Sequence, residues 1–283
     1  MTTLPLGKPI PTPTRYSPGL LCPVDRRENR VACRVDDRFH GYDAWHAREA
    51  SFITRRGLPV VGLLKIVYPA ASPFLVESKS LKLYLHSLNM TPLGDDPAEG
   101  IEQFTRVVRA DLERVLQAPV AARFFADAPG HRPFDFDDHA ILEQMPDVAR
   151  ASFAGRPPSL LAASLPAGDV KVGSHLLRGK CKITGQPDWG SIFIRVKGDR
   201  LPSPVALARY IVSLRDEFHF HEEICEMVYQ QLHDVLAPDI LSVTCLYTRR
   251  GGIDICPARA SDPAHLPPRL GNPGILTRDT FRQ

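Results

Sequence analysis

The chain has 283 residues, of which 43% are hydrophobic and 24% charged, a balance typical of a globular protein that buries a core without disulfides or a structural metal. Its 35 basic and 32 acidic residues nearly cancel, which gives no reason to expect a nucleic-acid or membrane partner. No apolar run approaches the roughly 20 residues that cross a bilayer, and the proline-rich start lacks the pattern of a signal peptide. We therefore expect a cytoplasmic protein.

The first half of the chain begins with scattered prolines and no sustained period, so residues 1–38 are predicted to form an irregular N-terminal arm. Residues 58–68 and 74–88 are rich in Val, Leu, Ile and Tyr with partial alternation, which predicts two strands around a loop at 69–73. Asp96-Pro97-Ala98-Glu99 then has the carboxylate cap and first-turn proline of a helix start. Apolar residues at helical spacing predict that this helix continues to about residue 117.

Prolines, glycines and acidic residues dominate 128–170, which we interpret as a linker with at most a short helix near 141–144. In the second half, strands are predicted at 176–184 and 191–196, joined through residues 185–188, and then two helices, one opening at Ser203-Pro204 and one over 224–236. Residues 240–247 and 253–256 form a predicted hairpin across Arg249-Arg250-Gly251-Gly252. The first half follows a looser version of this order, so the pattern predicts an α+β fold with antiparallel sheets.

Six cysteines are present, and none belongs to a C-x-x-C pair, so the sequence supports neither a zinc knuckle nor a thioredoxin-like motif. The most informative cysteine is Cys181, which precedes a Gly185-Gln186-Pro187-Asp188 turn. Such a turn can bring the Asp188 carboxyl near the thiol, where it can deliver a proton as the sulfur adds to a substrate. The alternatives are a core cysteine and an aspartate that only caps the turn.

Two further segments contain carboxylates in suggestive positions. Glu222, in Phe220-His221-Glu222-Glu223 at a helix start, can simply stabilise the helix, or it can accept two hydrogen bonds from a guanine-like edge. His219 and His221 would not share a helix face, and no third ligand lies nearby, so we expect no metal site. Glu77 follows the apolar run Phe74-Leu75-Val76, where a buried carboxylate needs a partner.

The hairpin turn at Arg249-Arg250-Gly251-Gly252 is most simply a turn with exposed arginines. Two arginines beside glycines would also suit a phosphate-bearing cofactor. Because the sequence contains neither G-x-G-x-x-G nor G-x-x-x-x-G-K-[ST], a dinucleotide would have to bind outside a Rossmann or P-loop frame.

Together these segments resemble the 7-cyano-7-deazaguanine reductases of queuosine biosynthesis, in their long, two-module form. The resemblance rests on four motifs in the family's order, spaced over most of residues 39–257. They are Glu77 to Tyr84, Cys181 to Trp189, Phe220-His221-Glu222, and Tyr247 to Asp254. A departure is leucine at position 81, where an aromatic residue is common.

The resemblance implies a tandem tunnelling fold (T-fold), in which antiparallel sheets are each backed by helices. It divides the chain into the arm at 1–38, a first module at 39–127, the linker at 128–170, a second module at 171–260 and a tail at 261–283. It implies an NADPH-dependent enzyme acting on 7-cyano-7-deazaguanine, as a homodimer or larger assembly.

The resemblance also assigns roles to individual residues. Cys181 would form a thioimidate with the nitrile, and Asp188 would donate protons. Val76, Glu77, Ser78, His221 and Glu222 would hold the deazaguanine, while Ser78, Lys79, Arg250 and Gly251 would contact NADPH. The intermediate imine must be kept from water, so we expect an enclosed site.

Three other functions compete with this reading. A cysteine nitrilase would release an acid and ammonia without consuming NADPH, and would leave the Asp188 turn and the arginine hairpin without a role. A cyclohydrolase of the same superfamily would need a zinc cluster, which the scattered cysteines do not supply. A non-catalytic purine-binding module would explain Glu222 and leave Cys181 and Asp188 idle.

Overall fold

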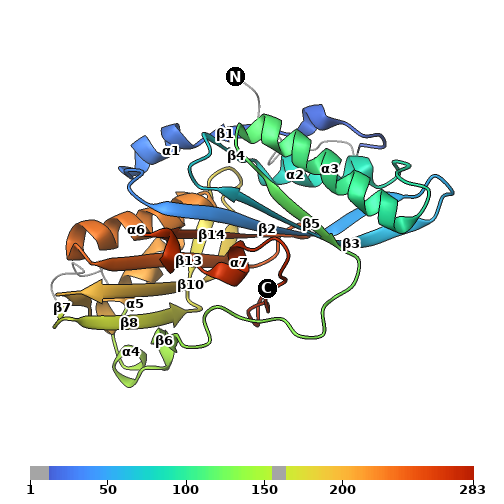
Figure 1. The fold of residues 1–283 in the computed structure, drawn as a ribbon. Coiled ribbons are helices and arrows are strands. Elements are labelled where there is room, and N and C mark those ends of the chain that lie inside the picture. Colours follow the sequence, from blue (N-terminus) through green and yellow to red (C-terminus); the bar gives the residue numbers. More distant parts are fainter. Residues whose placement is uncertain (1–12, 155–163) are drawn as a thin grey trace.

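One continuous sheet runs through both halves of the chain in the computed structural model, which describes residues 13–154 and 164–283 (Figure 1). Part of the predicted arm and part of the predicted linker lie outside these residues. The strands of the sheet follow one another in the order β12-β9-β10-β13-β14-β2-β3-β5, with β8 beside β10 and β6 beside β8. All the neighbouring pairs are antiparallel except β12 with β9 and β6 with β8, so the fold is α+β as expected.

The first half contains β1 (Pro23–Asp25), α1 (Arg26–Cys33), β2 (His40–Ile53), β3 (Pro59–Pro69), β4 (Phe74–Val76), α2 (Ser78–Leu88), α3 (Pro97–Leu116) and β5 (Ala121–Phe125). The connection contains β6 (Ala140–Ile141), a 3-10 turn at Leu142–Gln144, α4 (Pro146–Ala149) and β7 (Ser164–Leu165). The second half contains β8 (Gly168–Ser174), β9 (Arg178–Cys181), β10 (Pro187–Gly198), β11 (Leu201–Pro202), α5 (Pro204–Ser213), β12 (Phe218–His219), α6 (His221–Leu236), β13 (Ile240–Tyr247), β14 (Ile253–Ala260) and α7 (Pro268–Gly271).

Each half builds its own core from one helix stripe and one face of its strands. On α3, Phe104, Val108, Leu112 and Leu116 are fully buried against residues of β2 and β3. On α6, an equivalent stripe from Ile224 to Leu236 packs with α5 against β10 and β13. Residues three or four apart lie on one side of a helix, so these spacings explain why both helices were predictable from the sequence.

The two halves meet edge to edge where β14 pairs with β2. All of β14 takes part, from Ile253 opposite Ala47 to Ala260 opposite His40. The predicted hairpin of β13 and β14 is confirmed, and its turn has positive φ angles at Gly251 and Gly252. A left-handed backbone at both positions explains why glycine occurs there.

Two expectations for the first half are wrong. Residues 74–88 were expected to form a strand, but only Phe74–Val76 does, and Ser78–Leu88 is the helix α2. The apolar residues between 81 and 88 satisfy both a strand and a helix period, and the carboxylate of Glu77 decides between them by accepting hydrogen bonds from the first turn. Residues 26–33 of the expected irregular arm form α1, which is capped by the Asp25 side chain.

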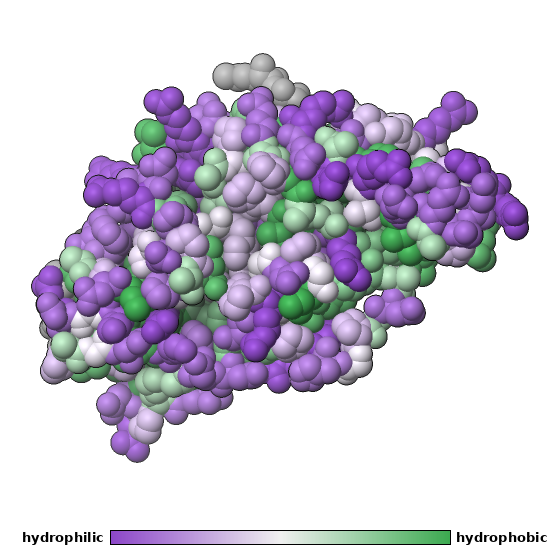
Figure 2. Space-filling model, in the orientation of Figure 1, coloured by the Kyte–Doolittle hydropathy of each residue, from purple (hydrophilic) through white to green (hydrophobic). Residues whose placement is uncertain are grey.

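The face of the sheet opposite α2 and α3 is covered by the connection and by the C-terminal segment, which run beneath it in Figure 1. A smaller apolar cluster there includes Phe136 from the connection, Phe193 from β10 and Leu270 from α7. Hydrophilic residues dominate the face of the molecule shown in Figure 2, with apolar residues in small patches between them. In the described part of the chain, every helix is too short or too polar to span a membrane.

Candidate active site

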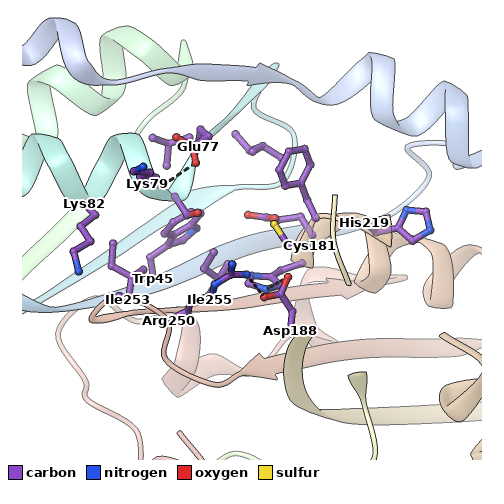
Figure 3. A pocket seen from close by; sticks show the side chains of 17 residues that line it. Trp45, Glu77, Lys79, Lys82, Cys181, Asp188, His219, Arg250, Ile253 and Ile255 are labelled. Carbon is purple, nitrogen blue, oxygen red and sulfur yellow. Dashed lines mark hydrogen bonds and ion pairs between the residues drawn. The ribbon is translucent and has the colours of Figure 1, made fainter. Parts of the chain in front are cut away.

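A pocket lies where the two halves of the sheet meet, between the N-terminal ends of α2 and α6 (Figure 3). Its volume is about 340 Å³, which falls in the range of small-molecule sites. All ten residues to which the resemblance assigned a role line this one pocket: Val76, Glu77, Ser78, Lys79, Cys181, Asp188, His221, Glu222, Arg250 and Gly251. The structure therefore brings together side chains from four separate segments within a single chain.

Cys181 reaches the pocket from the end of β9, where the predicted turn reverses the chain. The Cys181 amide donates to the carbonyl of Gln186, and the Gly185 amide donates back to the carbonyl of Cys181. Gly185 has a φ of +66°, a conformation that glycine adopts without strain. The side chains of Cys181 and Asp188 are both buried in the protein but border the same cavity, so this thiol is not sealed in a dry core.

The carboxylate of Asp188 contacts the side chains of Arg250 and His221. Arg250 Nη1 donates to Asp188 Oδ1 at 2.8 Å, and His221 Nε2 lies 3.5 Å from Oδ2. Burial by itself would raise the pKa of Asp188, but its interactions with His221 and Arg250 outweigh that effect and lower the pKa. Asp188 is thus an anion at neutral pH in this state.

Arg250 is not the freely exposed turn residue that the hairpin pattern alone suggested. Besides Asp188, it donates from Nη2 to Thr184 Oγ1 at 3.0 Å and to the side-chain oxygen of Gln186. The hairpin turn is thereby tied to the turn that carries the cysteine and the aspartate. Arg250, which the resemblance assigned to the cofactor, thus contacts Asp188, the proposed proton donor.

Glu77 is a buried carboxylate that is satisfied by backbone amides at the start of α2. Its two oxygens accept from the backbone amides of Lys79 and Ser80 at 2.8 and 2.7 Å. Burial raises the pKa of Glu77, and the two backbone hydrogen bonds oppose that rise. The carboxylate fixes the first turn of α2, and through it the positions of Ser78 and Lys79 in the pocket wall.

Glu222 in the first turn of α6 is 3% exposed. Its Oε1 has no hydrogen-bond partner among the described residues. Burial raises the pKa of Glu222 to about 7, and the charge of Asp43 acts in the same direction, whereas His221 and Arg26 oppose it. A buried acceptor without a partner costs free energy, so this oxygen is available to a ligand that brings an N–H group.

Seven residues of the pocket wall received no role from the sequence: Trp45, Leu75, Lys82, His219, Phe220, Ile253 and Ile255. Most are apolar, and an apolar side chain on a strand has the same pattern whether it faces the core or a cavity. Lys82 could have been found, because it lies three residues after Lys79 and shares its face of α2. The mistaken strand assignment for 74–88 concealed that relation.

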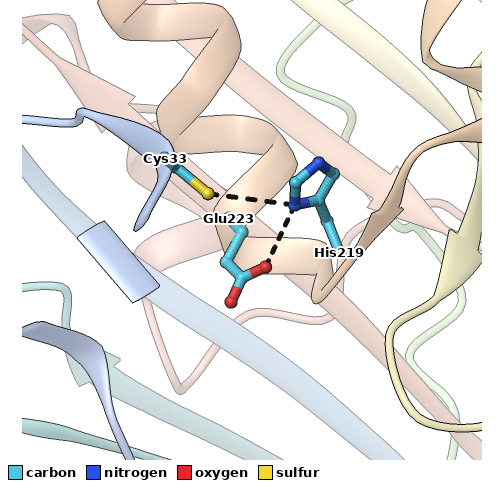
Figure 4. Close-up of side chains that lie close together, drawn as sticks. All are labelled: Cys33, His219 and Glu223. Carbon is cyan, nitrogen blue, oxygen red and sulfur yellow. Dashed lines mark hydrogen bonds and ion pairs between the residues drawn. The ribbon is translucent and has the colours of Figure 1, made fainter. Parts of the chain in front are cut away.

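One side-chain group beside the pocket has the composition of a metal site (Figure 4). Cys33 Sγ lies 3.8 Å from His219 Nδ1, which is 3.2 Å from a carboxylate oxygen of Glu223. That carboxylate already accepts from the backbone amide of Phe220 and from Lys182 Nζ, at 3.1 and 3.0 Å. Its contacts are those of a carboxylate that closes the first turn of α6 and pairs with a lysine.

The pocket also contains groups that suit a phosphate-bearing cofactor. Lys79, Lys82 and Arg250 line it, and Gly251 presents backbone at a positive φ of 61°. Lys82 Nζ lies 3.4 Å from a carboxylate oxygen of Glu49, which is largely exposed. Cationic side chains and an accessible backbone are the usual partners of phosphate, so these residues fit a dinucleotide.

Known proteins resemble the chain over most of its length. A family model described as "Nitrile reductase, 7-cyano-7-deazaguanine-reductase N-term" matches residues 12–124, and one described as "QueF-like protein" matches residues 187–265. The NADPH-dependent 7-cyano-7-deazaguanine reductase of Acinetobacter baumannii (strain ACICU) is 38% identical over 269 residues, which cover 93% of this chain and 94% of that protein.

Two relatives from other species agree. The enzyme of the same name from Stenotrophomonas maltophilia (strain K279a) is 38% identical, over 90% of this chain and 92% of its own. That from Acinetobacter baylyi is 36% identical, over 96% of this chain and 97% of its own. The chain belongs to the family of NADPH-dependent 7-cyano-7-deazaguanine reductases, whose fold is the T-fold.

Proposed function

We propose that this protein reduces the nitrile of 7-cyano-7-deazaguanine to the aminomethyl group with NADPH, a step of queuosine biosynthesis. The observation that carries the proposal is the presence of Cys181 in the same cavity as Asp188 and the unpartnered carboxylate oxygen of Glu222. A nucleophile, a proton-transfer group and a purine acceptor in one pocket are the groups that this reaction needs.

Recognition of the base is assigned to the ends of α2 and α6. The carboxylate of Glu222 can accept the ring N–H and the amino group of a guanine-like edge as two parallel hydrogen bonds. His221 stacks on Tyr247 with ring centroids 3.9 Å apart, which fixes the imidazole beside the pocket. Val76, Glu77 and Ser78 also line the pocket, and we assign them to the base as well.

Cys181 is proposed to attack the nitrile carbon and form a thioimidate. Because Asp188 is an anion before the reaction, it first accepts the thiol proton as the S–C bond forms. It then passes this proton to the nitrile nitrogen, so that the C≡N bond becomes C=N–H without free charge. Asp188 therefore acts first as a base and then as an acid. Its ion pairs with Arg250 and His221 favour the anion that the first step needs.

The dinucleotide is assigned to the cationic side of the pocket, with contacts from Ser78, Lys79, Arg250 and Gly251. When bound, NADPH supplies hydride to carbon, and full reduction of a nitrile to an amine takes two hydrides and hence two NADPH. The burial of Cys181, Asp188 and Glu222 supports the requirement that water be kept from the imine between the two reductions.

Three further expectations stay predictions. We propose that the protein is a homodimer and works in the cytoplasm, as the resemblance implies. The module boundaries at 39–127 and 171–260 are also retained as a proposal, since family models match segments on either side of the connection.

A direct assay tests the proposed activity. The protein is mixed with 7-cyano-7-deazaguanine and NADPH, and both the NADPH absorbance and the product mass are followed. We expect loss of absorbance with an amine product. A carboxylic acid formed without loss of NADPH absorbance would select a nitrilase instead, and tight binding without turnover would select a purine-binding module.

The first specific prediction concerns the nucleophile. Cys181→Ala should abolish turnover, a loss of at least about 10³-fold because no other group replaces a covalent nucleophile. Without NADPH, the unmodified chain should gain the mass of the nitrile, and Cys181→Ala should not. Cys33→Ala is the matched control, since Cys33 lies outside the pocket wall, and should keep both adduct and activity. An adduct that persists in Cys181→Ala would contradict the assignment.

A further inference from the structure

A network of buried charges lies beneath the base-binding end of the pocket, and the N-terminal helix α1 completes it. Arg259 on β14 is fully buried and donates to Asp43 Oδ1 at 2.9 Å and to Glu226 Oε1 at 2.8 Å. Arg26 of α1 donates to the other oxygen of Asp43. Arg30, one turn further along α1, donates to both oxygens of Glu226 at 2.9 and 3.0 Å.

Two arginines donate to each carboxylate of this network, Arg26 and Arg259 to Asp43, and Arg30 and Arg259 to Glu226. Arg26 Nη1 also lies 3.9 Å from Glu226 Oε1. Three guanidinium groups against two carboxylates leave one excess positive charge in a region that excludes water. An unbalanced buried charge is costly, and a third carboxylate nearby would balance it. Glu222 lies one turn before Glu226 on α6, and the charge of Arg26 lowers its pKa.

Arg26 reaches α6 one turn after Glu222, where its Nη1 lies 3.9 Å from Glu226 Oε1, and it is the arginine whose charge lowers the pKa of Glu222. It belongs to a segment whose sequence carried no signal of a role, and it is 3% exposed. Its guanidinium also lies over the ring of Tyr68, with 5.7 Å to the centroid, and donates to Ser72. These contacts from β3 and its following loop hold the guanidinium in one place beneath the pocket.

We infer that Arg26 is a positioning residue for the substrate, acting through Asp43 to keep Glu222 an anion that can accept the edge of the base. This inference rests on the proposed function, in which Glu222 is the purine acceptor. By neutralising Asp43, Arg26 removes much of the repulsion that Glu222 would otherwise face. The N-terminal segment thus becomes part of the active-site support, and the binding of the base depends on it.

The groups around Glu222 act in known directions. Asp43 on β2 raises its pKa, and His221 on α6 and Arg26 on α1 lower it. Burial raises the pKa of Tyr68 on β3 and of Tyr247 on β13, and the charge of Glu222 raises both further, so both phenol groups stay neutral. Loss of Arg26 must therefore raise the pKa of Glu222 further, and loss of Asp43 must lower it.

The test measures the dissociation constant of 7-cyano-7-deazaguanine by calorimetry from about pH 6 to about pH 9, a window that brackets the titration of Glu222. A Cys181→Ala background, without NADPH, keeps binding non-covalent. In this background the affinity should rise with pH through about 7, the pKa of Glu222. Arg26→Gln should move that midpoint up by about one unit and weaken binding about 5-fold at pH 7, and about 10-fold at lower pH.

Three companion variants separate an electrostatic role from a structural one. Arg26→Lys keeps the charge and should shift the midpoint less than Arg26→Gln does. Asp43→Asn should shift it in the opposite direction, downward, an outcome that general destabilisation does not produce. Arg30→Gln removes an arginine that pairs with Glu226 and does not contact Asp43, so it should move the midpoint less than Arg26→Gln does.

The outcomes distinguish the inference from the function beneath it. If the Cys181→Ala protein does not bind 7-cyano-7-deazaguanine at any pH, the proposed function fails. If it binds, and neither Arg26→Gln nor Asp43→Asn moves the midpoint, the inference about Arg26 fails while the proposed function stands. Should Arg26→Gln not fold, the paired shifts of Arg26→Lys and Asp43→Asn decide the question.

Discussion

At the scale of single residues, the turn between β9 and β10 depends both on its local sequence and on a contact from a distant part of the chain. Gly185 and Pro187 reverse the chain, and the sequence was sufficient to predict that reversal. It was not sufficient to predict that Arg250, 62 residues after Asp188, would pair with its carboxylate. Together with His221, that contact lowers the pKa of Asp188 and favours its anion before the reaction.

The pairing of Arg250 with Asp188 leads to a pH prediction. Arg250→Gln should raise the pKa of Asp188, because a neighbouring positive charge that lowers it is removed. The anion needed to accept the thiol proton then persists only at higher pH, so the acidic limb of adduct formation should move to higher pH. The rate of mass gain on Cys181 without NADPH, measured against pH, checks this.

Arg249→Gln is the control for this experiment. Arg249 is the adjacent arginine in the same turn, and it donates to the backbone oxygen of Gln283, away from Asp188. Its pH profile should match that of the unmodified protein. Identical profiles for both arginine variants would contradict the proposed role of Asp188 as the first proton acceptor.

At the scale of elements, periodicity identified the long amphipathic helices and failed where two periods coincided. α3 and α6 have stripes that only a helix explains, and both were predicted. In α2, buried residues occur at nearly every position from 80 to 88, so the burial pattern is compatible with either element. The cap formed by Glu77 distinguishes the helix from a strand. A carboxylate directly before Ser78 is a signal of a helix start, because its oxygens can accept hydrogen bonds from the first-turn amides.

The cap of α3 provides a stability prediction. Asp96 accepts from the backbone amide of Glu99 at 2.9 Å, so Asp96→Ala should lower the free energy of unfolding by about 1 kcal/mol. The denaturation midpoint should fall with little change in slope, and catalysis should be unaffected. Glu102→Ala, on an exposed position of the same helix, should change stability by less than about 0.5 kcal/mol. Equal losses in the two variants would argue against the cap.

At the scale of the whole molecule, the C-terminal segment closes the face of the sheet opposite α2 and α3. Lys65 of β3 is fully buried there, and its ammonium group donates to the backbone carbonyl of Ile275 at 2.7 Å. Burial lowers the pKa of Lys65 to about 8, and the nearby acidic groups oppose this only in part. The tail, to which the sequence assigned no role, is therefore packed over a titratable group.

Lys65 makes stability depend on pH in a defined direction. Its pKa is about 8 in the folded chain, against the usual 10.5, so the unfolded chain binds more protons between these values. The contribution of Lys65 to the free energy of unfolding should therefore rise as pH increases from about 8 to about 10.5, by up to a few kcal/mol. Denaturant unfolding across this window should show a steeper rise in the unmodified protein than in Lys65→Met. Parallel curves would rule out this linkage.

What the sequence determined by itself is the Gly185 turn, the helices α3, α5 and α6, the α+β class and the motifs that carry ten of the pocket residues, because each depends on neighbours in the chain or on a motif. What only the tertiary structure decided is which groups face one another across elements. The pairing of β14 with β2 places both helix starts at one cavity, and the ion pairs of Arg259 with Asp43 and of Arg250 with Asp188 join charges from separate elements. Charge interactions between buried groups depend on distance through a medium of low dielectric constant, and a linear pattern of residues does not contain those distances.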